Sequence, residues 1–178
     1  MKSFLWSLVV IIGFMILAGA AVIWSGVYDV AADSPHLKVT FWLLDEAREQ
    51  SIETHSRGIV APLLQGEQIV DRGFPHFNET CRLCHGGPGL SPLEFTQGLY
   101  PKPPLFPSRE VQQELNDVEL YWVIKHGLKM TAMPSFGVNH SDEDLWAIVA
   151  FMRRLPTLSP QEYQAMAQRA LKSQHSGP

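Results

Sequence analysis

Two cysteines and a histidine stand together near the middle of the chain, in the run Cys81-Arg82-Leu83-Cys84-His85. In this C-x-x-C-H spacing each thiol can add to a vinyl group of a haem, and the histidine can bind the iron from one side. A structural disulfide or two unrelated thiols are the alternatives. Zinc would need further ligand pairs, although the chain has no other cysteine, and a thioredoxin-type pair would need a βαβ unit, for which we find no strands. The pattern therefore favours covalent haem.

A second iron ligand can be sought among two methionines, Met130 and Met133, which share one loop. A thioether ligand raises the reduction potential of a haem and suits reversible electron transfer, although core packing is the commoner fate of any single methionine. Pro134 disfavours the α conformation at Met133 and holds that residue extended, whereas Met130 has no such restraint. We predict Met133 as the ligand, with Met130 as the alternative.

The residues around the motif carry a family resemblance. In chain order they are Gly73, Phe77, the motif itself, Gly86, Gly87, Gly89, Met133-Pro134 and a patterned helix ending near Arg154. Found together in this order, they make residues 66 to 156 similar to class I c-type cytochromes, especially the single-haem domains of subunit III of cbb3-type oxidases. The resemblance implies an all-α class I cytochrome c fold with one covalent haem c. It implies Cys81 and Cys84 as attachment points and His85 and Met133 as iron ligands. It also implies a loop carbonyl that accepts the Nδ1 proton of His85.

The N-terminal stretch Phe4–Trp24 contains 21 consecutive residues without a charge. At 1.5 Å per residue this is long enough for a bilayer core of roughly 30 Å, so we predict one transmembrane helix. A cleaved signal peptide, with small residues at 18–20 as its cleavage site, is the alternative, but its apolar core would be shorter. Lys2 before the span and Asp29 and Asp33 after it place the N-terminus in the cytoplasm by the positive-inside rule.

An amphipathic helix is predicted between residues 35 and 59, as a link from the anchor to the haem domain. Its Phe41 and Trp42, together with Trp24 and Tyr28, form either an aromatic belt at the lipid headgroups or a packing surface for the haem domain. Both interpretations stay open. His36 and His55 bracket this helix and are expected to be ordinary surface histidines rather than metal ligands.

The remaining elements follow from capping and proline signals. We predict a helix over 63–80 with a kink or restart at Pro75, a proline-rich loop over 86–107, and helices over 116–126, 141–154 and 160–171. Gly73 marks either a close helix crossing or a helix end. The predicted divisions are an anchor (1–26), an amphipathic linker helix (27–60), a cytochrome c haem domain (61–157), and a C-terminal helix with tail (158–178).

The functional expectation is a membrane-anchored mono-haem cytochrome that transfers single electrons between redox partner proteins of a respiratory chain. A permanent cytochrome c subunit of an oxidase, dehydrogenase or reductase complex is the alternative. Neither an enzyme nor a small-molecule substrate is expected, because Met133 would fill the iron site that catalysis needs. The net charge of −4 and the lack of a basic stretch give no reason to expect nucleic acid. The resemblance and the span together imply a single-pass protein of a bacterial inner membrane, with the haem domain in the periplasm and lipid around the N-terminal helix.

Overall fold

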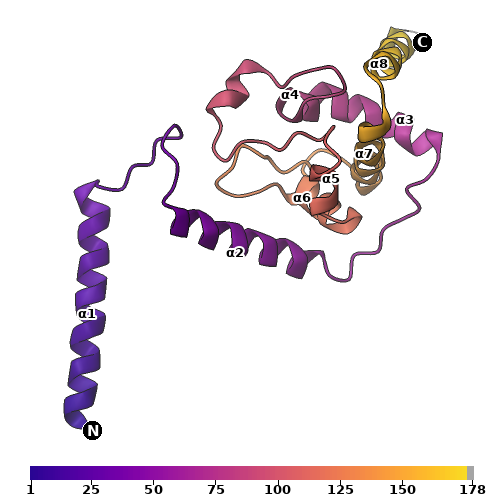
Figure 1. Ribbon diagram of the computed structural model, residues 1–178. Helices are drawn as coiled ribbons and strands as arrows, with labels where there is room; N and C mark the ends of the chain where they lie inside the picture. Colours follow the sequence, from indigo (N-terminus) through magenta and orange to yellow (C-terminus); the bar gives the residue numbers. More distant parts are fainter. Residues whose placement is uncertain (176–178) are drawn as a thin grey trace. The chain divides into compact units, whose positions relative to one another are not determined.

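The computed structural model describes residues 1–175, and within this part of the chain it is all-helical, with no β-strand. The last three residues of the predicted C-terminal tail, 176–178, lie outside the described residues. The chain forms two compact units, residues 1–35 and the residues from His36 onward. In chain order (Figure 1) the elements are α1 (Lys2–Ser25), α2 (Lys38–Ser56), α3 (Glu67–His76), a π-helical segment (Phe77–Cys81), α4 (Arg82–His85), a 3-10 helix (Glu94–Gly98), α5 (Val111–Glu114), α6 (Asp117–His126), α7 (Asp142–Arg154), a second 3-10 helix (Leu155–Thr157) and α8 (Pro160–His175).

The first unit consists of α1 and the residues that follow it. The 24 residues of α1 have a mean hydropathy of 2.5 in their most apolar stretch, and none of that stretch is buried within the chain. Such a helix is long and apolar enough to cross a membrane. It ends at Gly26, which adopts the left-handed conformation with φ of 65°.

The second unit is built on the crossing of α3 and α7. At Gly73 a Cβ atom would lie 1.9 Å from the carbonyl oxygen of Ala147, so only glycine lets the two backbones approach this closely. Phe77 and Phe74 then pack on Phe151, with ring centroids 5.2 and 5.3 Å apart. Of the two interpretations of Gly73, the close crossing is confirmed and the helix end is wrong, because α3 continues past this residue.

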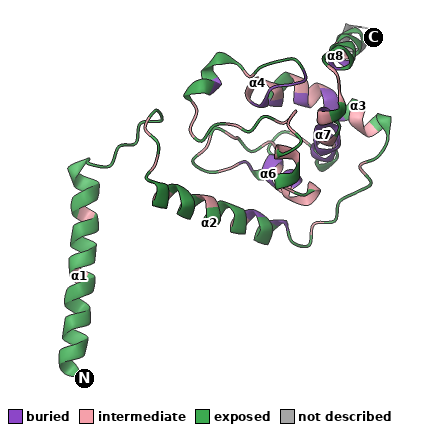
Figure 2. Cartoon of the chain, in the orientation of Figure 1, coloured by how far each residue is buried: buried purple, intermediate pink, exposed green. Residues whose placement is uncertain are grey.

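Around this crossing lies the hydrophobic core, to which α7 contributes an unbroken buried run from Leu145 to Met152. Figure 2 shows buried residues concentrated in α7 and in parts of α3, α4 and α6. Tyr163 and Met166 of α8 are buried in the same core, so α8 is packed on the crossing rather than projecting from it. At the other side, Ile52 near the end of α2 is buried, and the His55 ring lies 5.7 Å from the Trp122 ring of α6.

Both capping predictions are confirmed. Asn116 and Glu119 form a capping box at the start of α6, and Ser141 and Asp144 form one at the start of α7. Each pair satisfies two backbone donors that a helix terminus would otherwise leave without partners. These local signals fix where α6 and α7 begin.

Other predicted boundaries need correction. The helix expected from residue 63 begins at Glu67, because Gly66 with φ of 120° breaks the helical conformation before it. Pro75 does not interrupt the helix; instead, the backbone changes from α to π geometry at Phe77. The loop over 86–107 includes the 3-10 helix Glu94–Gly98, and α8 extends to His175 rather than 171. The helix predicted between residues 35 and 59 is α2, which spans Lys38–Ser56.

Arg153, at the end of α7, ties down the segment before α6. Its guanidinium donates to the Asp117 carboxylate at 2.7 Å and to the carbonyls of Leu115, at 2.7 Å, and Gln112. We expect Arg153→Met to lower the free energy of unfolding by about 2 kcal/mol, because it leaves three acceptors without their donor. The neighbouring Arg154 is exposed, so Arg154→Met should change the free energy of unfolding by less than about 0.5 kcal/mol. Urea unfolding measures both, and equal losses would contradict the assignment.

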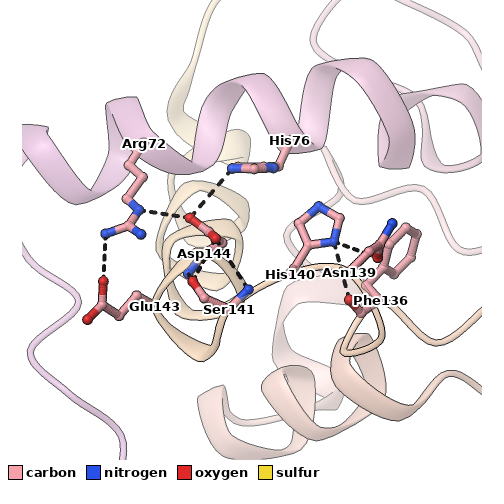
Figure 3. Close-up of polar contacts among 8 residues, drawn as sticks. All are labelled: Arg72, His76, Phe136, Asn139, His140, Ser141, Glu143 and Asp144. Carbon is pink, nitrogen blue, oxygen red and sulfur yellow. Dashed lines mark hydrogen bonds and ion pairs between the residues drawn. The ribbon is translucent and has the colours of Figure 1, made fainter.

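The N-terminus of α7 carries a polar cluster that faces α3 (Figure 3). Asp144 accepts from Arg72 at 2.9 Å and from the Ser141 hydroxyl at 2.6 Å, and it lies 3.7 Å from Nε2 of His76. Beside it the His76 and His140 rings meet edge to face with centroids 5.0 Å apart. The cluster therefore links α3 to the end of the loop between α6 and α7, which carries Met130 and Met133 and which we call the methionine loop.

The Ser141 hydrogen bond, helped by Arg72, lowers the pKa of Asp144. A carboxyl whose pKa is lower in the folded state stabilises the fold at neutral pH, and this contribution is lost as the pH falls through the folded pKa. We expect Asp144→Asn to destabilise the protein by a constant amount above about pH 5 and the difference to shrink below about pH 3.9. Urea unfolding at several pH values tests this, and a difference that grew on acidification would refute it.

Candidate functional site

The two cysteines of the motif lie on consecutive helical turns. Cys81 ends the π-helical segment, and Cys84 lies in α4. Both are free thiols; Cys81 is buried and Cys84 is partly exposed. Burial raises the pKa of Cys81 to about 12 and also raises that of Cys84. Both thiols are therefore protonated at neutral pH, and no disulfide joins them.

His85 follows directly as the last residue of α4. It is buried, and its Nδ1 lies 2.8 Å from the carbonyl oxygen of Pro104. A carbonyl can only accept, so Nδ1 carries the proton and Nε2 keeps the lone pair that binds a metal. Burial lowers the pKa of His85, although the Pro104 carbonyl acts in the opposite direction. The ring is therefore held neutral and in the tautomer that an iron ligand requires.

The loop after His85 supplies the partners that orient this ring. The family resemblance implies a loop carbonyl that accepts the Nδ1 proton of His85, and the structure identifies it as the carbonyl of Pro104. The Phe106 ring stacks on His85 with centroids 4.1 Å apart and planes 20° apart, and its backbone N–H donates to the His85 carbonyl at 3.3 Å. Phe106 belongs to the proline-rich loop predicted over residues 86–107. The structure assigns it a place against the ring of the predicted iron ligand.

An open cleft of about 630 Å³ adjoins His85. Its wall is formed by the glycines after the motif and by the end of the proline-rich loop, including Gly86, Gly87, Leu90, Leu105 and Pro107. Gly86 has φ of 71°, and this left-handed turn ends α4 and directs the chain around the cleft. A second cleft, of about 460 Å³ between α3, α7 and α8, contains no residue of the motif. Of these two clefts, only the one beside His85 includes a residue of the motif, and Cys81, Cys84 and Met133 line neither of them.

The methionine loop is held by its own backbone. The Met133 carbonyl accepts from the Leu128 N–H at 3.1 Å, and the Met133 N–H donates to the Thr131 hydroxyl at 3.0 Å. At Gly127, where φ is 68°, a Cβ would lie 2.6 Å from the carbonyl carbon of Pro134, so the loop passes directly over this glycine. The loop geometry around Met133 is thus fixed by contacts on both sides of it.

The two methionines of this loop differ in their surroundings. Met133 is partly buried and packs against the hydrophobic core, whereas the Met130 side chain is 84% exposed. Met130 also adopts a left-handed conformation with φ of 59°, which is uncommon for a residue with a side chain. These observations favour Met133 over Met130 as the predicted second ligand.

Sequence reasoning missed the residues of α8 that pack against the segment carrying the motif. Tyr163 of α8 is buried, and its hydroxyl donates to the Asn78 side-chain oxygen in the π-helical segment at 3.0 Å. The carbonyl of Asn78 in turn accepts from Nε of Arg82 at 3.2 Å. A Cβ at Gly87 would lie 3.3 Å from the Tyr163 ring, so α8 covers the segment that carries both cysteines. The apolar spacing of Tyr163, Met166 and Ala170 could have indicated this packing.

The other histidines named from the sequence make local contacts. The His36 ring meets the Tyr100 ring edge to face at 5.1 Å, and Nδ1 of His55 lies 2.8 Å from the Ser51 carbonyl. Within residues 1–175, no group of three or more histidine, cysteine, aspartate or glutamate side chains is placed to hold a metal ion. These contacts describe the surroundings of the two rings, and the assignment of His36 and His55 as ordinary surface histidines stays a prediction.

These features fit a covalently attached haem. Two reduced cysteines three residues apart can each form a thioether, the neutral His85 offers Nε2, and an open cleft lies beside it. Comparison with known protein families gives an independent result. Residues 68–152 match the family described as cytochrome C oxidase, cbb3-type, subunit III. No curated protein matches the chain.

Proposed function

We propose that this chain is a membrane-anchored mono-haem carrier of single electrons. Its residues 68–152 form a c-type cytochrome domain of the cbb3-type subunit III kind, which implies covalently bound haem c. Its partners would be redox proteins of a respiratory chain. The observation that carries the proposal is the His85 ring, which is buried, neutral and oriented by the Pro104 carbonyl directly after the two cysteines. With only two cysteines in the chain, one attachment site and one haem are expected.

The bound haem would supply a one-electron ferric–ferrous couple. The chain would hold the group: Cys81 and Cys84 would attach it, and His85 and Met133 would supply the ligands to its iron. A hydrogen bond to a backbone carbonyl strengthens a histidine ligand, and a thioether ligand raises the potential. If His85 and Met133 both bind the iron, it would have no open site for peroxide or a gas, as a carrier rather than an enzyme requires.

Membrane anchoring by α1 completes the proposal. The length and apolarity of α1 suit a bilayer, and Lys2 before the span with Asp29 and Asp33 after it favours a cytoplasmic N-terminus. The haem domain would then lie in the periplasm of a bacterial inner membrane. N-terminal sequencing of the mature protein should begin at Met1. A start near Ala21 would indicate a cleaved signal peptide and a secreted protein instead.

A permanent subunit of an oxidase, dehydrogenase or reductase complex is the second candidate. The match to an oxidase subunit family favours it. Purification of the native protein in mild detergent should separate the two: a carrier is expected to migrate alone, with one haem per chain, and to be reduced and reoxidised by membranes that lack it. Co-purification with larger redox subunits in fixed ratio would favour the subunit role. A protein without haem, or one that membranes neither reduce nor oxidise, would overturn both candidates.

A further inference from the structure

Large apolar side chains at the start of α2 face solvent. They are Leu37, Val39, Phe41, Trp42, Leu43 and Leu44, which we call the apolar end of α2. Trp42 is 59% exposed, whereas Ile52 near the other end is 3% exposed. At 100° per residue the six positions are distributed around the whole helix circumference rather than along one stripe. Packing on one side of the haem domain therefore could not cover them.

The rest of α2 has a different character. From Asp45 onward it carries charged side chains, Ile52 and Ser56 are buried, and the His55 ring lies beside the Trp122 ring of α6. Figure 2 shows buried residues only toward the C-terminal end of α2. At the opposite end, the His36 backbone N–H donates to the Tyr100 hydroxyl at 3.2 Å. The helix is thus attached to the haem domain near its C-terminal end and, just before its start, through the His36 backbone. The side chains of its apolar end nevertheless stay exposed to solvent.

We propose that the apolar end of α2 lies in the interfacial layer of the membrane that α1 spans. This inference rests on the proposed anchoring by α1. Residues 26–37 connect the two helices, and they extend at most about 40 Å, so α2 begins within reach of the bilayer surface. The amphipathic ring of Trp42 suits the headgroup region, where aromatic residues are enriched.

The charges of α2 support lipid as the occupant. Lys38 carries the only charge between residues 37 and 44, and a cation is attracted to anionic headgroups. Asp45, Glu46, Glu49 and Glu53 follow, and like charge keeps this half away from the same surface. Arg48 is the one cation among them and pairs with Asp45 at 2.8 Å, so this half stays acidic overall. An apolar end with one cation and an acidic half give a tilted helix whose start enters the interface.

Such a contact would orient the haem domain. The start of α2 is bonded to Tyr100, which lies in the loop whose two ends line the cleft beside His85. Insertion of the apolar end therefore fixes the direction of the cleft relative to the bilayer, instead of leaving the domain to rotate on its tether. A cleft held at a constant angle to the membrane suits a partner that docks from within the membrane plane.

The test uses full-length haem-containing protein, one chain per lipid nanodisc, with an environment-sensitive fluorophore on an introduced cysteine. Leu43→Cys and Gln50→Cys place the label two turns apart on the same side of α2. We expect lipids with a nitroxide near the headgroup to reduce the emission of the label at position 43 about twofold, and iodide in the water to have little effect on it. The label at position 50 should respond to iodide and little to the nitroxide lipid.

A third variant separates this inference from the anchoring itself. Gly13→Cys lies in α1, where a side chain meets nothing within 4 Å, and its label should be quenched by a nitroxide placed deep in the bilayer. If position 13 is quenched and position 43 is open to iodide, the inference is wrong and the anchor stands. If position 13 is not quenched either, the anchoring fails as well. Protection of position 43 from iodide without quenching by lipid would mean that protein covers it, which also refutes the proposal.

Discussion

Replacing Met133 with alanine is expected to open the sixth position of the iron, lower the reduction potential, and let carbon monoxide or cyanide bind readily. The methionine–iron charge-transfer band in the far red should disappear at the same time. The reason is geometric: Met133 is partly buried in a loop that hydrogen bonds at Leu128 and Thr131 hold in place. Absorption spectra and a redox titration of the purified variant measure these changes.

Met130→Ala is the matched control, because it removes the same side chain from the same loop. Met130 is 84% exposed, so this variant should keep its charge-transfer band, its potential and its resistance to added ligands. If the band instead vanished in Met130→Ala and survived in Met133→Ala, the ligand assignment would be reversed. Electron transfer would stand in that case, since either methionine closes the site.

The sequence predicted well those parts of the fold that depend on residues close together in the chain. The capping boxes at Asn116 and Ser141 were found because each needs only two residues three positions apart. The cytochrome family could be named from the C-x-x-C-H spacing with its flanking glycines and Met133-Pro134, and the family match over residues 68–152 agrees with it.

Other features depend on tertiary contacts and could not be predicted. Which carbonyl orients His85 depends on how a loop of six prolines returns to the cleft, and no local rule selects Pro104. The π-helical segment between Pro75 and Cys81 was expected only as an irregularity. Tyr163 reaches Asn78 across 85 positions of sequence, so its contact with the motif segment was found only in the structure.

The α2 helix shows how sequence periodicity can mislead. Leu37, Phe41 and Leu44 share the helical spacing of Ile52, which predicts one continuous buried face. Of these four side chains only Ile52 is buried, because α2 packs on the haem domain near its C-terminal end, where the His55 ring also lies beside the Trp122 ring of α6. Of the two interpretations of Phe41 and Trp42, packing on the haem domain is not what the structure shows, since both side chains are exposed. The lipid contact is therefore the interpretation that remains to be tested.

The largest loss of stability is expected from Gly73→Ala. The new Cβ would lie 1.9 Å from the carbonyl oxygen and 2.4 Å from the carbonyl carbon of Ala147. Both are backbone atoms in the middle of α7, so no side-chain rotation relieves the overlap and the two helices must move apart. That movement also separates the aromatic contacts of Phe74 and Phe77 with Phe151.

Overpacking of this kind at the main helix crossing should cost about 3 kcal/mol or more of unfolding free energy. The disturbed packing includes Phe77, which begins the π-helical segment that leads to both cysteines. The yield of haem-containing protein should therefore fall as well. Urea unfolding followed by circular dichroism measures the first effect, and haem content per chain measures the second. Gly98→Ala is the control, because a Cβ at exposed Gly98 meets nothing within 4 Å. It should be neutral or slightly stabilising, since alanine restricts the unfolded chain. Equal stability of the two variants would show that α3 and α7 do not need glycine to cross, and the packing of the haem domain on this contact would have to be abandoned.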